Sequence, residues 1–433
     1  MTPLTRLMDA CTELMSDIGE ASMRNVGDGL LRAYRELPAD RRVEFFTHLV
    51  ESYGVDPQRV ERAYAAWAAT GRDTARAAAA EIELVDAVEP RRQKLFRRIN
   101  HAPGATHALT ELRSDLRALL ADHPHLRSLD HDLHHLLGSW FNRGFLRMEE
   151  VTWDSPGELL DHLIRYEQVH PMAGLDELRR RLQPADRRMY AFFHPATGIR
   201  PLIFVEVALT RGVPADIAPI LRPGPALSVT EADTAVLYSI SNCLDGLAGV
   251  SLGSLLIKHV IDEVGDALPH LSTFVTLSPI PGFRRWLDAQ DDPHLRGLRH
   301  RLAALDLTQE PDRDDTAEVD ELRPHVVAAA ARYICLVKDD SGRPHDRVAR
   351  FHLSNGAEAW RLNWPADCSA NGITQSYGAM VNYRYEPAEL EPRHERFVRH
   401  GTVASSDAVT DLLTTHSGSC RPAPPSNERK SHQ

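Results

Sequence analysis

The chain has 433 residues, 42% of them hydrophobic and 26% charged, and a formal net charge of -11 at pH 7. This length exceeds one ordinary core, so two domains are expected, and the acidic balance argues against a general nucleic-acid binder. We expect neither a membrane partner nor secretion. Apolar stretches stop short of the roughly 18 residues that a spanning helix needs, and Asp9 and Glu13 interrupt any signal-peptide core.

The cysteines are odd in number, far apart in the sequence and without a CxxC pair. They are Cys11, Cys243, Cys335, Cys368 and Cys420. Paired spacing is what a disulfide framework or a structural zinc site requires. The pattern therefore predicts reduced thiols in a cytoplasmic protein.

The first part of the chain has a helical period. Leucines recur at three- and four-residue steps, which gathers them on one helix face, and prolines divide the segment into helices of moderate length. These leucines are Leu109, Leu112, Leu116, Leu119 and Leu120. We predict an all-α helical bundle over residues 1–180 that assists assembly into a homo-oligomer.

The sequence pattern changes near Pro184, where short runs rich in β-branched and aromatic residues begin. Expected strands cover residues 201–209, 234–241, 271–277 and 381–385, with helices over 251–264 and within 293–337. Strand, glycine-bearing turn, helix and strand form an α/β unit, so the fold class is α+β with two domains. The second domain is predicted over 181–400. Small and polar residues predict a disordered tail over 401–433.

The turn DGLAGVSLGS, residues 245–254, lies between an expected strand and the start of a helix. Glycines let the backbone approach a phosphate, and the free N–H groups of a first helical turn attract anions. An ordinary entry into a helix explains the same residues. Both interpretations stay open on the residues alone.

Ser278 lies in the run LSPIPGF, residues 277–283. A serine before a proline and a short helical segment is a credible helix N-cap, whose hydroxyl would accept from a free amide. The functional alternative places its hydroxyl at the end of a core strand, where it can bind a substrate or an imidazole.

His352 lies in the run FHLSNGA, residues 351–357, and is one of 22 histidines. Asp346 can cap a short helix that Gly356 ends. A partly buried structural histidine and a proton donor are the two alternatives.

These two runs, together with SWFNRGF at residues 139–145, closely resemble the malonyl-CoA decarboxylase family. The resemblance implies that the second domain is a variant of the acetyltransferase fold called GNAT. It further implies that malonyl-CoA is the substrate, that no cofactor is needed, and that Ser278 and His352 are catalytic, with His352 as proton donor. The implied coenzyme A contacts are Ala248, Gly249, Val250, Ser251, Leu252, Gly253 and Ser254, besides Ser278 and His352. The general GNAT phosphate pattern is kept only at Gly253.

A histidine-rich segment offers a competing site. His131 and His135 are four residues apart, a spacing that can bind a metal from one helix face, but the glutamate of an HExxH motif is missing. The interspersed acids suit a solvated helix surface, so no metal site is predicted.

The predicted function is the decarboxylation of malonyl-CoA to acetyl-CoA and CO2, as a step of malonate or fatty-acid metabolism. Donors to the thioester oxygen would stabilise the enolate, and an imidazole can protonate its carbon. One alternative is an acyltransferase that decarboxylates a malonyl unit and passes acetyl to a carrier-protein thiol. Another is a non-catalytic scaffold that binds coenzyme A.

Overall fold

The computed structural model describes residues 2–71, 74–250, 253–308 and 313–415. The chain divides into two compact units. The first comprises Met1–Glu149, Ala191–Phe204 and Asn242–Leu252, and the second comprises Glu150–Tyr190, Val205–Ser241 and Gly253–Gln433.

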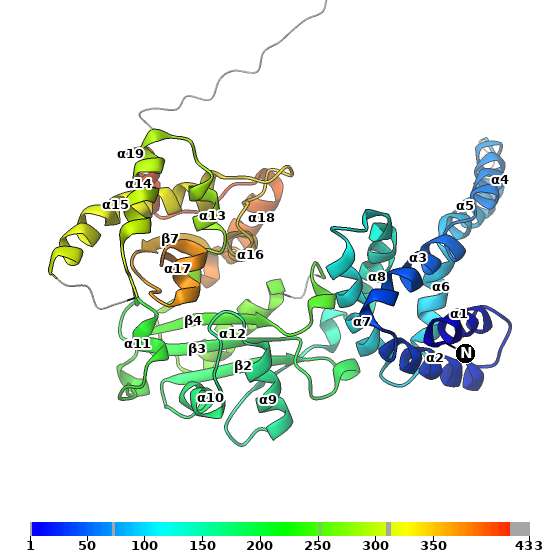
Figure 1. Ribbon diagram of the computed structural model, residues 1–433, viewed down its shortest axis with the longest axis horizontal. Helices are drawn as coiled ribbons and strands as arrows, with labels where there is room; N and C mark the ends of the chain where they lie inside the picture. The colour runs from blue at the N-terminus through cyan, green and yellow to red at the C-terminus, as the bar shows by residue number, and fades with distance from the viewer. Residues whose placement is uncertain (1, 72–73, 251–252, 309–312, 416–433) are drawn as a thin grey trace, which may run out of the picture. The chain divides into compact units, whose positions relative to one another are not determined.

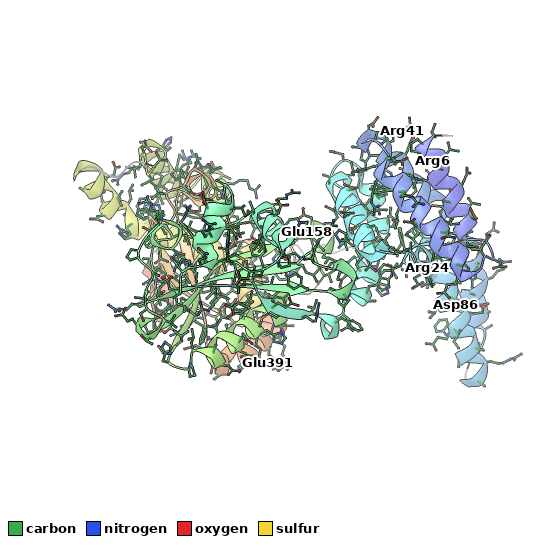
Figure 2. The ribbon with its side chains drawn as sticks, turned by 90° about the horizontal axis from the view of Figure 1, so that it is seen from below. Arg6, Arg24, Arg41, Asp86, Glu158 and Glu391 are labelled. Atoms are coloured by element: carbon green, nitrogen blue, oxygen red, sulfur yellow. The ribbon has the colours of Figure 1, made fainter. Side chains whose placement is uncertain are left out.

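The first unit is built on a bundle of α-helices (Figure 1). Its helices are α1 (Pro3–Leu14), α2 (Glu20–Arg35), α3 (Arg42–Ser52), α4 (Pro57–Ala68), α5 (Thr74–Val88), α6 (Arg91–Ile99), α7 (Ala105–Leu119) and α8 (Arg127–Trp140). The predicted leucine stripe of α7 is confirmed, because Leu109, Leu112 and Leu116 are fully buried in the bundle core. Charged side chains such as Arg6 and Arg24 lie on its exposed surface (Figure 2).

Helices α4 and α5 lie side by side as a hairpin (Figure 1). The Asp56 side chain caps α4 by accepting from the Gln58 N–H at 3.0 Å, and Pro57 occupies the first helical turn, where a missing N–H costs nothing. The sequence thus specifies the start of this helix locally.

A mixed sheet follows the bundle in the sequence. Its strands are β1 (Arg147–Glu150), β2 (Arg187–Phe193), β3 (Ile203–Thr210), β4 (Thr234–Asn242), β5 (Thr273–Thr276), β6 (Ser278–Pro279), β7 (Glu358–Asn363) and β8 (Met380–Tyr385). They are ordered β1-β2-β3-β4-β5-β8-β6, with β7 also paired to β8, and β2, β3 and β4 lie side by side in Figure 1. β4 and β5 are parallel, whereas β8 is antiparallel to β5, β6 and β7.

Helices connect and cover these strands. They are α9 (Gly157–Tyr166), α10 (Leu175–Leu182), α11 (Ala218–Leu221), α12 (Gly253–Ala267), α13 (Phe283–Asp288), α14 (Pro293–Ala304), α15 (Arg313–Leu336), α16 (Arg347–Ser354), α17 (Ala370–Ser376), α18 (Leu390–His400) and α19 (Asp407–Thr415). One apolar cluster joins Val236 of β4, Val275 of β5 and Met380 of β8, all fully buried. It fixes the central strands against one another.

The predicted two-part α+β fold class is confirmed by this order of helices and strands. The predicted strand, turn, helix and strand correspond to β4, the 3-10 turn Asp245–Leu247, α12 and β5. Strands β1, β2, β6 and β7 were not predicted. The domain boundary that we placed near residue 180 stays a prediction.

The predicted disordered tail differs from the structure over Asp407–Thr415, which forms helix α19. The Ser406 hydroxyl accepts from the Val409 N–H at 3.2 Å, and the buried Val409 anchors the helix. The rest of the predicted tail, residues 416–433, lies outside the described residues.

Within the described residues, no helix is long and apolar enough to cross a membrane. Four of the cysteines lie there, Cys11, Cys243, Cys335 and Cys368, and all four are free thiols.

Candidate active site

Ser278 lies in strand β6, directly after β5, and pairs with Val381 of β8. Pro279 follows it in register with Met380 of β8, and its lack of an N–H group suits the end of the strand. Helix α13 begins at Phe283 with Gly282, at φ 96°, in the N-cap position. The helix-cap interpretation of Ser278 is therefore wrong. The short helix expected after this proline-containing run is confirmed, but its N-cap is Gly282 and not Ser278.

His352 lies in the last turn of α16. The Asp346 carboxylate caps this helix by accepting from the Ala349 N–H at 2.8 Å, as predicted. The predicted stop at Gly356 is also confirmed: its φ is +80°, and a Cβ atom there would lie 2.0 Å from the carbonyl oxygen of Leu390. Only glycine fits such a position. Cap and stop together place the imidazole.

The structure brings Ser278 and His352 into contact. His352 Nε2 lies 3.1 Å from Ser278 Oγ, and His352 Nδ1 lies 2.7 Å from the Tyr385 hydroxyl. The Ser278 hydroxyl donates to Thr276 Oγ1 at 2.8 Å. These groups are buried: Ser278 is 5% exposed and His352 is 3% exposed. Tyr385 and Thr276 were not predicted as site residues.

The directions of these hydrogen bonds indicate one tautomer of His352. Since the single proton of the Ser278 hydroxyl goes to Thr276, Ser278 accepts from Nε2–H. A neutral imidazole carries one proton, so Nδ1 is then the acceptor and Tyr385 is the donor. The site therefore forms a directed chain from Tyr385 through His352 and Ser278 to Thr276.

Burial keeps these groups neutral. It lowers the pKa of His352 to about 3, because the charged imidazolium would lose its hydration. Burial also raises the pKa of Tyr385 well above its ordinary value, so its hydroxyl keeps its proton. At neutral pH the chain of hydrogen bonds carries no net charge.

A second tyrosine fixes the plane of the imidazole. The ring of Tyr383 stacks on that of His352, with centroids 4.6 Å apart and planes at 23°. The Tyr383 N–H donates to Thr276 Oγ1 at 3.2 Å, which ties the end of β5 to β8. Tyr383 and Tyr385 are two residues apart on a predicted strand and share a face. That spacing is the sequence signal by which they could have been found.

Asn382, between these tyrosines, holds the strands in register. Its side-chain amide donates to the Thr276 carbonyl oxygen at 2.8 Å, and its oxygen accepts from Asn363 at 2.8 Å. Asn382 is fully buried, and a buried amide is costly unless its hydrogen bonds are made. Thr276, at the end of strand β5 and two residues before Ser278, is therefore held by hydrogen bonds from both Asn382 and Tyr383 of β8.

The predicted phosphate turn is described only in part. Ala248, Gly249 and Val250 follow the 3-10 turn, Gly253 and Ser254 begin α12, and Ser251 and Leu252 lie outside the described residues. Gly249 has φ +85°, a conformation that favours glycine. The turn and the Ser278–His352 pair belong to different compact units, so the structure does not join them into one site.

The acids beside the histidine-rich segment of α8 have other partners. Asp132 is paired with Arg92 and accepts from Gln93 at 2.8 Å, and Asp130 accepts from Arg113 at 2.8 Å. In the described ranges, no three His, Cys, Asp or Glu side chains are grouped so that they could hold a metal ion.

Comparison with known proteins assigns the chain to a family. Residues 144–422 match the malonyl-CoA decarboxylase C-terminal domain, and residues 53–141 match the N-terminal domain of the same family. The mitochondrial malonyl-CoA decarboxylase of Anser anser anser is 36% identical over 421 residues, which are 89% of this chain and 82% of that protein. That of Rattus norvegicus is 34% identical over 87% of this chain and 82% of its own length.

Solved structures agree with this assignment. Malonyl-CoA decarboxylase from Rhodopseudomonas palustris superposes with a TM-score of 0.86 at 44% identity, and covers 94% of this chain and 99% of its own. The enzyme from Agrobacterium vitis gives a TM-score of 0.84 at 41% identity, with the same coverage of 94% and 99%. Sequence and fold together place this chain in the malonyl-CoA decarboxylase family.

Proposed function

We propose that the protein decarboxylates malonyl-CoA to acetyl-CoA and CO2. The observation that carries this proposal is the buried contact of 3.1 Å between Ser278 Oγ and His352 Nε2, in a chain of this family. The reaction needs stabilisation of an enolate and the delivery of one proton to carbon. A serine and a histidine in hydrogen-bond contact suit both needs.

The proton balance assigns a role to His352. Loss of CO2 from the malonyl carboxylate leaves an enolate, and one proton must reach the former methylene carbon. The free imidazole is neutral because burial lowers its pKa to about 3. A bound carboxylate places a negative charge beside it and raises that pKa, so the imidazole takes up a proton from solvent with the substrate. His352 then gives this proton to the carbon.

Ser278 and Tyr385 position the imidazole. Tyr385 donates to Nδ1 of the neutral ring, and its oxygen can accept from Nδ1–H once the ring is protonated. The same hydroxyl therefore serves both states without movement of the strand. Ser278 orients Nε2 and can turn its hydroxyl toward the substrate carboxylate. Neither step uses a metal or an organic cofactor.

Coenzyme A would bind at the turn Ala248–Ser254, with its pyrophosphate at the start of α12. The N–H groups of Leu247, Ala248 and Val250 donate within the turn, to Leu244, Asp245 and Leu247. The phosphate donors are therefore expected in the first turn of α12, which has the positive end of the helix dipole.

The helical hairpin suggests how copies of the chain assemble. Every side chain of α4 is at least partly exposed, and Trp67 on α4 and Ile82 on α5 are 41% and 65% exposed. Exposed apolar side chains mark an interaction surface where they gather into one patch, as several do along this hairpin. The proposed protein is a homo-oligomer whose interface covers the hairpin. It acts in the cytoplasm, in malonate or fatty-acid metabolism. Light scattering on Ile82→Asp tests the assembly.

The decisive experiment is product analysis by mass spectrometry. The purified protein is incubated with malonyl-CoA, methylmalonyl-CoA or malonyl carrier protein, each with and without EDTA. We expect acetyl-CoA and CO2 from malonyl-CoA in the presence of EDTA. Acetyl transfer to the carrier thiol would favour an acyltransferase, and binding of coenzyme A without any product would favour a scaffold.

A further inference from the structure

Thr276, the last residue of β5, accepts two hydrogen bonds at its hydroxyl oxygen. The Ser278 hydroxyl donates to Thr276 Oγ1 at 2.8 Å, and the Tyr383 N–H of β8 donates to it at 3.2 Å. A threonine hydroxyl has two lone pairs, so these two donors occupy both. Thr276 is fully buried, and solvent therefore does not compete for either lone pair.

The sheet fixes the position of this hydroxyl. Thr276 lies opposite Leu237 in the parallel pairing of β4 and β5, and its carbonyl oxygen accepts from the Asn382 side chain at 2.8 Å. The donor from Tyr383 is a backbone group, which cannot rotate independently of β8. The side chain of a threonine is stiff at χ1. Thr276 Oγ1 is therefore a rigid acceptor beside Ser278.

A serine and a histidine in contact are also the pair that enzymes use for nucleophilic attack. In such a pair, the serine hydroxyl donates to an unprotonated imidazole nitrogen, which removes the proton as the serine oxygen attacks. The distance of 3.1 Å between Ser278 Oγ and His352 Nε2 permits this arrangement. A thioester is open to such an attack, and both malonyl-CoA and acetyl-CoA are thioesters. A decarboxylase must keep that bond intact.

The hydrogen bond to Thr276 imposes the opposite direction on the pair. Because the Ser278 proton is directed at Thr276, the contact with His352 is made by Nε2–H, and Nδ1 accepts from the Tyr385 hydroxyl. In this tautomer Nε2 has no lone pair for the serine proton. The pair can then donate hydrogen bonds but cannot generate a serine alkoxide.

We propose that Thr276 is a positioning residue that makes the Ser278–His352 pair selective against thioester cleavage: it holds the Ser278 proton and so prevents His352 from acting as a base toward the serine. This inference rests on the proposed function, since it presumes a thioester in the site. In the suppressed reaction, Ser278 Oγ bonds to the thioester carbonyl carbon and the carbon–sulfur bond breaks. The serine proton passes through Nε2 to the leaving thiolate, and water then cleaves the serine ester.

The first test reads the tautomer of His352 in Thr276→Val, which keeps the shape of the side chain and loses Oγ1. The Ser278 hydroxyl should then donate to Nε2, and the ring proton should move to Nδ1, where the Tyr385 oxygen can accept it. Nitrogen-15 NMR of the full-length protein separates protonated from unprotonated ring nitrogens. A His352→Gln sample identifies the signals of this ring among the 22 histidines. We expect Nε2–H in wild type and Nδ1–H in Thr276→Val.

The second test uses acetyl-CoA, which has no carboxylate to lose, so the release of free thiol reports thioester cleavage alone. Thr276→Val should release thiol about tenfold faster than wild type. A larger gain is not expected, because burial lowers the pKa of His352 to about 3 and leaves it a weak base. Addition of Ser278→Ala should abolish the gain. Mass spectrometry after an acid quench should find an acetyl group on Ser278 of Thr276→Val.

Two variants serve as controls. Thr276→Ser keeps the acceptor oxygen, so it should keep the Nε2–H tautomer and release no more thiol than wild type. Thr234→Val removes another buried hydroxyl of the sheet, on β4, which donates to Asp233 at 2.6 Å. It should move neither readout. A purely structural role of Thr276 would lower the melting temperature of Thr276→Val without a change of tautomer or a release of thiol.

The outcomes separate this inference from the proposed function, because neither readout uses decarboxylation. A wild-type protein that releases no CO2 from malonyl-CoA would refute the decarboxylase and leave both tests of Thr276 in place. Nδ1–H in wild type would overturn the inference, even if Thr276→Val does not fold. Retention of Nε2–H in a folded Thr276→Val protein would also overturn it, and so would thiol release no faster than that of wild type.

Discussion

Tyr385 and Tyr383 allow a sharp test of the active-site hydrogen bonds, because both contact His352 from the same face of β8. The Tyr385 hydroxyl lies 2.7 Å from His352 Nδ1, whereas the buried Tyr383 hydroxyl has no hydrogen-bond partner among the residues that the structure describes. Phenylalanine removes either hydroxyl and keeps the ring. Tyr385→Phe and Tyr383→Phe are therefore matched variants that differ only in whether a hydrogen bond is lost.

The expected effects have opposite signs. Tyr385→Phe leaves Nδ1 buried and unsatisfied, which costs about 1–3 kcal/mol and lowers the melting temperature of a chain of this size by roughly 1–3 °C. It also removes the donor that favours the tautomer with Nε2–H, so kcat should fall about tenfold to hundredfold. Tyr383→Phe relieves the desolvation of an unpaired hydroxyl and should be neutral or stabilising, with kcat near that of wild type.

The assays are differential scanning calorimetry and steady-state turnover of malonyl-CoA, on both variants and wild type. Circular dichroism checks that each variant is folded. Equal stability and equal kcat for the two variants would refute the assigned hydrogen-bond chain, because the Tyr385 hydroxyl would then contribute no more than an unpaired one.

Three further predictions concern the charged and reacting groups of this site. His352→Ala should lower kcat by roughly 10²- to 10⁴-fold with little change in the Kd for coenzyme A, measured by stopped-flow assay and calorimetry; a kcat near wild type would exclude it as proton donor. Ser278→Ala should also lower kcat, and the double variant should be far less impaired than the product of the single losses, because residues that act as a unit are non-additive; multiplicative losses would separate the two roles. Burial raises the pKa of Asp346 from 3.8 to about 7. The protonated carboxyl therefore stabilises the folded state by roughly 4 kcal/mol below pH 3.8, and this stabilisation is lost as the pH rises through 7. Asp346→Asn keeps an N-cap acceptor, so its melting temperature should exceed that of wild type at pH 8 and not at pH 4.

Local signals predicted the elements that depend on local chemistry. Asp346 and Gly356 define α16 from within a few residues, and the strand predicted at 234–241 is β4. Strand β7 was missed because a register shift between Ala359 and Arg361 breaks the alternation by which strands are recognised. Strand β2 begins with the charged pair Arg187 and Arg188, which conceals its apolar run.

The partners of the predicted site residues depend on contacts between distant segments. Ser278 and His352 were found through motifs of the family, but Tyr385 is 33 residues from His352, and its contact exists only because β8 pairs with β5 and β6. The spacing of Tyr383 and Tyr385 marks them as sharing one face of a strand, but it does not identify their partner, because sheet register decides which side chains meet.

The depressed pKa of His352 gives the site a property that an exposed histidine would lack. An exposed imidazole is partly charged near pH 6.5 whether or not substrate is present. Here burial keeps the ring neutral, since its pKa is about 3, and the only charge that can change this is one that enters the site. In the proposed reaction, protonation would then be coupled to the arrival of the substrate carboxylate. The same burial would keep water from the enolate, so the proton carried by His352 would be the one delivered to carbon.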